Sequence, residues 1–133
     1  MSEITTSAAE YMSAVPRFSA LEVVDLGREA AAVTGLFRNQ VMSQVNGHCL
    51  RLGVLDGQYP WHFHPGSDEL FLVLDGRLVI ELEDGMELTL DRHQSVTIPA
   101  GVVHRTRGEG RTVNLCVEAV AAETVFVDGP APR

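Results

Sequence analysis

Apolar and polar residues alternate in short runs from Asn39 onward, a pattern that is typical of half-buried β-strands. Gly-containing and Pro-containing steps separate these runs at short intervals and predict tight turns. The spacing of runs and turns predicts an all-β sandwich or barrel. The turn signals are Asn46-Gly47, Asp56-Gly57, Pro65-Gly66, Asp75-Gly76, Asp84-Gly85 and Pro99-Ala100-Gly101.

The chain of 133 residues is long enough for one domain with a hydrophobic core, but not for two. Residues 1–17 show no sustained hydrophobic period, and we expect an N-terminal arm that is either mobile or caps a sheet edge. Residues 18–127 are expected to form the single domain. Residues 128–133 are expected to be a frayed C-terminal tail.

The segment before the β-rich region contains one predicted strand and one predicted helix. Residues 21–24 are apolar enough for a short strand. Asp25 is a suitable N-cap for a short helix over residues 26–34. Gly35 follows directly and can adopt the left-handed conformation that ends a helix.

Two turns assign the faces of the central strands. The Asp75-Gly76 pair predicts a two-residue type I′ hairpin, which places Glu69 opposite Leu82. The following turn is expected to use the three residues 83–85, because a two-residue turn would bring Glu87 onto the apolar face. The face that includes Glu69 also contains Phe71, Val73, Leu78, Ile80 and Leu82.

The opposite face of these strands is also partly apolar, since it includes Leu70, Leu72, Leu74 and Val79. An apolar strip of this size requires a cover. The candidates are the predicted helix, the N-terminal arm or an identical chain across a dimer axis. We expect a homodimer.

Three histidines and one glutamate form the candidate chemical site. His62 and His64 are two positions apart in an extended segment, so their side chains point the same way. Glu69 and His104 fall on the inner faces of two further predicted strands, although each residue alone has an ordinary structural explanation. Imidazole and carboxylate donors without thiolate suit Fe, Mn, Ni, Cu or Zn, with coordination positions left open. The set therefore predicts one divalent transition-metal ion.

Charge and hydropathy exclude several partners. The formal net charge of -8 disfavours nucleic acid and anionic membrane surfaces, which require basic patches. No apolar run approaches the length of a membrane span, and the N-terminus lacks the pattern of a secretory signal, so we expect a cytoplasmic protein. Cys49 and Cys116 are expected to be buried free thiols.

At these residues the chain resembles the cupin superfamily, and more closely the small bacterial single-domain cupins often labelled mannose-6-phosphate isomerase-like. The first cupin motif is matched by His62-Phe63-His64, Glu69 and Gly76, and the second by residues 99–104. The resemblance implies a small jelly-roll β-barrel in which His62, His64, Glu69 and His104 bind one metal ion. His93 departs from the family pattern, because the second motif has glycine there and histidine tolerates a positive φ less well.

The functional hypothesis is a metal-dependent enzyme acting on a small polar molecule that coordinates the metal, in a dioxygenase-like or isomerase-like reaction. The pocket is expected to be mostly apolar, with few acid–base groups, which disfavours sugar isomerisation. A non-enzymatic protein that binds a small molecule through the metal is the alternative, and a vestigial site without metal is the third hypothesis. The expected pocket residues are Phe71, Val73, Leu82 and Thr106.

Overall fold

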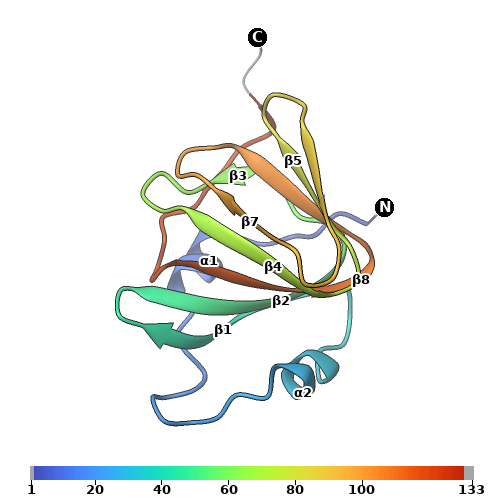
Figure 1. Cartoon of the computed structure of the whole chain (residues 1–133). Helices are drawn as coiled ribbons and strands as arrows, with labels where there is room; N and C mark the ends of the chain where they lie inside the picture. Colours follow the sequence, from blue (N-terminus) through green and yellow to red (C-terminus); the bar gives the residue numbers. More distant parts are fainter. Residues whose placement is uncertain (1, 131–133) are drawn as a thin grey trace.

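The computed structural model describes residues 2–130 and confirms the all-β prediction. Within these residues, two short helices accompany one curled sheet of nine strands (Figure 1). The helices are α1 (Ala8–Ser13) and α2 (Leu26–Ala31). The strands are β1 (Phe37–Val45), β2 (His48–Gln58), β3 (His62–Phe63), β4 (Glu69–Asp75), β5 (Leu78–Leu82), β6 (Glu87–Leu90), β7 (Ser95–Ile98), β8 (His104–Ala119) and β9 (Val125–Phe126).

Strand β8 is the longest strand and connects the two halves of the sheet. Its first residues pair antiparallel with β5, ending at the pair of Leu82 with His104. Its later residues lie between β2 and β4 and pair with both. His104, at the start of β8, also pairs with His62 of β3. The pairing of β8 therefore brings together strands that are distant in the sequence.

The predicted hairpin at Asp75-Gly76 is wrong. Strand β4 pairs with β7 and β8, whereas β5 pairs with β6 and β8, so the chain changes neighbours at this corner. Gly76 has φ 80°, and a Cβ there would lie 2.6 Å from the carbonyl oxygen of Arg111. The Asp-Gly signal indicated a tight turn correctly, but a turn does not require its two flanking strands to pair.

The predicted face assignment holds despite the incorrect pairing, because the alternation of side chains in a strand does not depend on its partner. The inward residues of β4 and β5 contribute to one buried apolar cluster inside the barrel, with Leu82 packed against it. This inner cluster consists of Ile4, Leu55, Tyr59, Phe71, Val73, Leu78, Ile80, Leu90, Ile98 and Cys116.

The three-residue turn at 83–85 is confirmed. The Leu82 backbone N–H donates to the Met86 carbonyl at 2.8 Å, and Gly85 has φ 89°. His93 has φ 71°, so histidine does adopt the left-handed conformation at the position where the family pattern has glycine.

A second apolar cluster lies on the outer face of the sheet and is covered by α2 and the segment before it. Asp25 caps α2 as predicted, accepting a hydrogen bond from the Arg28 N–H at 2.9 Å, but the helix ends at Ala31 instead of residue 34, and Gly35, with φ 86°, lies beyond its C-cap Ala32. Leu72 and Leu74 pack into this cluster, so part of the predicted apolar strip is covered within the chain and the homodimer stays a prediction. The buried members are Ala30, Val33, Met42, Leu52, Val54, Val113 and Leu115.

The strand predicted over residues 21–24 is absent. Leu21 instead has φ 70° and is fully exposed, which is incompatible with an extended strand in the sheet. Apolar composition alone suggested the strand, and four residues are too few to show a period.

The N-terminal arm is attached to the barrel in two places. The Ile4 N–H donates to the Gln58 carbonyl at 2.8 Å, which extends the end of β2. Helix α1 follows, with Ser7 as its N-cap, and its one buried residue is Tyr11. Hydropathy does not predict α1, because a single buried side chain leaves no period.

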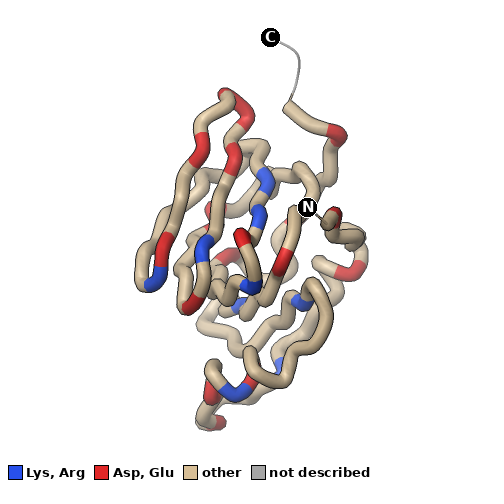
Figure 2. The backbone as a smooth tube through the Cα atoms, turned by 90° about the vertical axis from the view of Figure 1, so that its right-hand side faces the viewer, with Lys and Arg blue, Asp and Glu red and all other residues tan. Residues whose placement is uncertain are grey.

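The charge is spread over the surface. In Figure 2, the Arg positions lie among Asp and Glu positions and do not gather into one basic patch in this view. Among the described residues, no helix is long and apolar enough to cross a membrane. Cys49 and Cys116 are buried free thiols, as predicted.

Candidate metal centre

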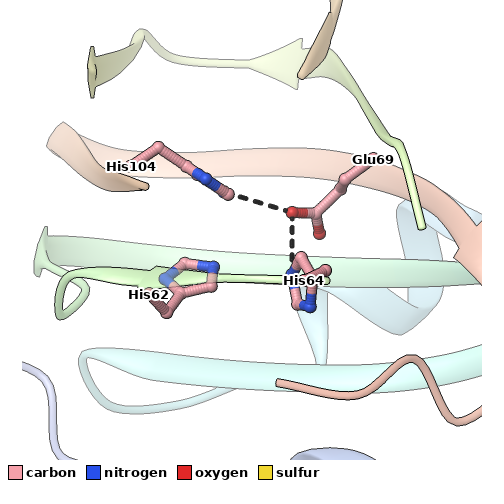
Figure 3. Close-up of side chains that lie close together, drawn as sticks. All are labelled: His62, His64, Glu69 and His104. Carbon is pink, nitrogen blue, oxygen red and sulfur yellow. Dashed lines mark ion pairs between the residues drawn. The ribbon is translucent and has the colours of Figure 1, made fainter. Parts of the chain in front are cut away.

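The structure brings the four predicted metal ligands together inside the barrel (Figure 3). One donor atom from each of His62, His64, Glu69 and His104 lies within 4.8 Å of the others, and all four residues are buried. His62 is on β3, His64 follows it, Glu69 begins β4 and His104 begins β8. The cluster could therefore hold a metal ion.

Backbone carbonyl groups orient all three imidazole rings. The Nδ1 atoms of His62 and His104 lie 2.8 Å and 2.9 Å from the carbonyl oxygens of Pro60 and Val102. The Nδ1 atom of His64 lies 3.2 Å from the Glu123 carbonyl oxygen. A proton on Nδ1 leaves the Nε2 lone pair free, which is the arrangement that second-layer hydrogen bonds impose on metal-binding histidines.

The donor atoms that face one another lack satisfactory hydrogen bonds. Glu69 Oε1 lies 3.2 Å from His64 Nε2 and 3.4 Å from His104 Nε2. These three atoms are buried and have no hydrogen-bond partner within the described chain. Buried polar atoms without partners are costly, and a cation between them would satisfy all three. The donor set thus fits a divalent transition-metal ion.

Burial and neighbouring charges shift the pKa values of His62 and Glu69 in the direction that favours binding of a cation, whereas the pKa of His64 shifts the other way. Burial, reinforced by His104, lowers the pKa of His62 to about 3, so this ring is neutral at pH 7. Burial opposes ionisation of Glu69, but contacts with His104 and His64 outweigh it and hold the pKa of this carboxyl well below its usual range. Burial would also lower the pKa of His64, yet the Glu69 and Glu118 carboxylates raise it.

A buried polar cluster beside these ligands was not predicted. The carboxylate of Glu118 forms an ion pair with Arg51, whose Nε lies 2.9 Å from Glu118 Oε1. The Tyr11 hydroxyl donates to Glu118, and the Arg51 guanidinium lies 3.7 Å from the centre of the Tyr11 ring. Glu118 Oε2 is 3.6 Å from His64 Nε2, so the cluster borders the candidate metal site directly.

The pKa values in this cluster follow from its burial. Burial and the charge of Glu69 raise the pKa of Glu118 to about 7. Burial and the two neighbouring carboxylates raise the pKa of Tyr11 well above its usual value, so its hydroxyl is a neutral donor at physiological pH.

One sequence signal could have identified Glu118. Alternation along β8 places it on the same face as Asn114 and Cys116, all of which are buried. The outward residues in this part of β8 are the apolar ones, and Leu115 packs against the α2 cluster. Because polar residues lie on the inward face and apolar residues on the outward face, hydropathy alone favours the wrong face as the interior.

A small cavity borders the candidate site. It has a volume of about 30 Å³, which accommodates about two water molecules. Phe71 and Thr106 line it, whereas the expectation for Val73 and Leu82 requires correction, because neither lines this cavity and both belong to the packed interior. The expectation of few polar groups also requires correction. Further polar groups in the lining come from Tyr11, Asn39, Tyr59 and Asn114.

Comparison with known proteins identifies the class. A family model described as a cupin domain matches residues 54–118. The uncharacterized protein YdbB of Bacillus subtilis is 53% identical over 90 residues, which cover 68% of this chain and 80% of YdbB. The chain therefore belongs to the cupin family.

Solved structures support the same class. A cupin-2 domain protein of Shewanella frigidimarina superposes with a TM-score of 0.68 at 25% identity, covering 73% of this chain and 94% of that one. A Neisseria meningitidis protein superposes with a TM-score of 0.67 at 26% identity, covering 74% and 99%. These likenesses confirm the cupin β-barrel, and the mannose-6-phosphate isomerase-like subtype stays a prediction.

Proposed function

We propose that this cupin is a metal-dependent enzyme that acts on a small polar molecule. His62, His64, Glu69 and His104 would hold one divalent transition ion, which would supply Lewis-acid or redox chemistry when bound. The observation that carries the proposal is the set of buried, unpartnered donor atoms on His64, Glu69 and His104. Burying such a set of polar atoms costs much free energy without a cation and much less when a cation binds them.

The cavity limits the substrate to a small molecule in the arrangement described. Its volume of about 30 Å³ is too small for a sugar, but it suits a compact group such as a carboxylate, a hydroxyl or a carbonyl. The amides of Asn39 and Asn114 could donate hydrogen bonds to such a group. A larger substrate would require α1 to move, because Tyr11 forms part of the cavity wall.

Reactions that move protons are consistent with this lining. Tyr11 offers a neutral hydroxyl at the cavity, and Glu118 lies directly behind it. A shortage of acid–base groups would favour dioxygenase-like over isomerase-like chemistry, but the polar lining of this cavity removes that preference.

A non-enzymatic binding protein is the second candidate, and the small volume of the cavity favours it. A metal ion with one or two waters would fill the space and stabilise the barrel without any substrate. Turnover and oxygen uptake across diols, keto acids and sugars separate the two candidates. Activity that never exceeds that of the free metal ion would support the binding protein.

Metal content provides the first test. Protein purified without a tag or added metal is expected to contain about one transition-metal ion per chain by elemental analysis, and His104→Ala is expected to lose it while keeping a cooperative thermal transition. His48→Ala is the matched control, because His48 is exposed and lies outside the cluster. Unchanged stoichiometry in His104→Ala would contradict the site.

A further inference from the structure

A second carboxylate lies beside the four predicted ligands and has one oxygen without a partner. The side chain of Glu118 is completely buried, and its Oε2 lies 3.6 Å from His64 Nε2. Neither atom has a hydrogen-bond partner within the described chain. The same imidazole nitrogen is 3.2 Å from Glu69 Oε1, so two bare carboxylate oxygens face one donor atom of His64.

Tyr11 holds the other oxygen of each carboxylate. Its hydroxyl donates to Glu118 Oε1 and lies 3.3 Å from Glu69 Oε2. The guanidinium of Arg51 also contacts Glu118 Oε1 and is anchored in turn by the Tyr11 carbonyl, which accepts from Nη2 at 2.8 Å. Each carboxylate thus has one oxygen engaged with protein groups and one oxygen left free.

The distances from His64 Nε2 to the two free carboxylate oxygens match those expected around one ion, although among the described residues only the four predicted ligands, without Glu118, have donor atoms that all lie within 4.8 Å of one another. Donors at bond lengths of 2.0–2.2 Å lie about 3 Å apart when adjacent and about 4.2 Å apart when opposite. The distances from His64 Nε2 to Glu69 Oε1 and to Glu118 Oε2, 3.2 Å and 3.6 Å, both fall in this range. Glu118 therefore stands in the same relation to His64 as the predicted ligand Glu69 does.

The charge of the cluster points in the same direction. When Glu69 and Glu118 are both ionised, they contribute two negative charges against the one positive charge of Arg51, and all three groups are buried. An excess negative charge in the interior is costly unless a cation compensates it. A divalent ion would reverse the local excess and satisfy the free oxygens.

We propose that Glu118 is a fifth protein donor to the metal ion, and that Tyr11 and Arg51 are positioning residues that hold its second oxygen. The proposal rests on the proposed function, because it requires that the centre bind a metal. Five protein donors would leave one position of an octahedron for a water or a substrate atom.

The test uses the full chain with Mn²⁺ for affinity and Co²⁺ as a spectroscopic probe, since the visible absorption of Co²⁺ strengthens as its coordination number falls. The double variant Arg51→Gln/Glu118→Gln removes both charges together, so that no buried charge is left unpaired. The matched control is Arg77→Gln/Asp91→Asn, which makes the same change in an exposed ion pair.

The double variant is expected to lose about tenfold or more in Mn²⁺ affinity and to show stronger Co²⁺ absorption. Tyr11→Phe, which keeps the ring and decides the matter if the double variant does not fold, is expected to change both readouts in the same direction by less. An unchanged Co²⁺ spectrum in the folded variant would overturn the proposal, even if affinity fell, because Glu118 would then act through its charge alone. Failure of the wild-type protein to bind either ion would instead overturn the proposed function.

Discussion

Helices α1 and α2 are both six residues long and both cover part of the barrel, but they bury opposite kinds of surface. Helix α2 lies below β1 and β2 in Figure 1 and covers an apolar cluster that includes Met42 and Leu52. Helix α1 buries only Tyr11, whose hydroxyl contacts two carboxylates. Helix α2 covers the apolar cluster on the outer face of the sheet, and helix α1 adds a polar group to the candidate site.

The difference explains why the two regions should respond differently to substitution. Apolar packing tolerates exchanges of similar volume, because dispersion and burial depend little on which apolar atoms are present. A buried polar cluster does not tolerate the loss of one partner, because the remaining group has neither water nor a counter-charge. Residues 51 and 52 are neighbours on β2 and face these two regions.

The largest effect is expected from Arg51→Met. This change leaves the Glu118 carboxylate buried without its guanidinium and should lower the free energy of unfolding by about 3–5 kcal/mol. Leu52→Met, the matched control on the opposite face, should cost less than about 1.5 kcal/mol, because the volume is conserved. Urea unfolding of the metal-free proteins measures both values. Equal losses in the two variants would remove the distinction between the regions.

The same distinction decides how much of the molecule was predictable from sequence. The face shared by Glu69 and Phe71 follows from alternation, and so does the burial of His104. The α2 helix follows from its cap at Asp25. Tyr11 and Glu118 were missed, because a polar side chain is buried only when other segments supply its partners, and these segments lie more than a hundred residues apart.

The change of strand partners at Asp75-Gly76 was missed for a related reason. A turn signal specifies the local backbone, whereas pairing with β8 is decided by contacts that are distant in sequence. Thr112 illustrates this, since its hydroxyl donates to the Arg77 carbonyl at 2.9 Å and holds the corner against β8.

A pH dependence of stability is expected next, from buried groups at the candidate site. The pKa of His62 in the folded protein is lowered to about 3. As the pH falls, the ring therefore becomes protonated in the unfolded chain before it does so in the folded protein. Its contribution to stability is complete above about pH 6.5 and is lost as the pH falls towards 3, by up to about 1.4 kcal/mol per pH unit. Glu118, with a raised pKa of about 7, has the opposite effect between about pH 4.5 and 7.

The contribution of His62 is isolated by comparing metal-free wild type with His62→Asn. The free energy of unfolding of the wild type should fall steadily relative to that of His62→Asn as the pH decreases from 6.5 to 4.5. His48→Asn serves as the exposed control outside the cluster. A difference for His62→Asn that is independent of pH would contradict the lowered pKa.

The smallest effect is expected from the two helix caps, and it separates the helices most directly. Ser7 accepts a hydrogen bond from the Glu10 N–H at 3.1 Å, and Asp25 accepts one from the Arg28 N–H at 2.9 Å. Replacing either cap with alanine should cost about 1 kcal/mol of helix stability.

For Asp25→Ala this cost should appear in global unfolding, because α2 packs on the core and unfolds with it. For Ser7→Ala the loss of helix stability should appear as faster exchange of the α1 amide hydrogens and as faster removal of the metal by a chelator, because α1 covers the site. The unfolding midpoint should be nearly unchanged, because α1 contributes only one buried side chain. The reverse pattern would mean that α1, and not α2, is part of the cooperative core.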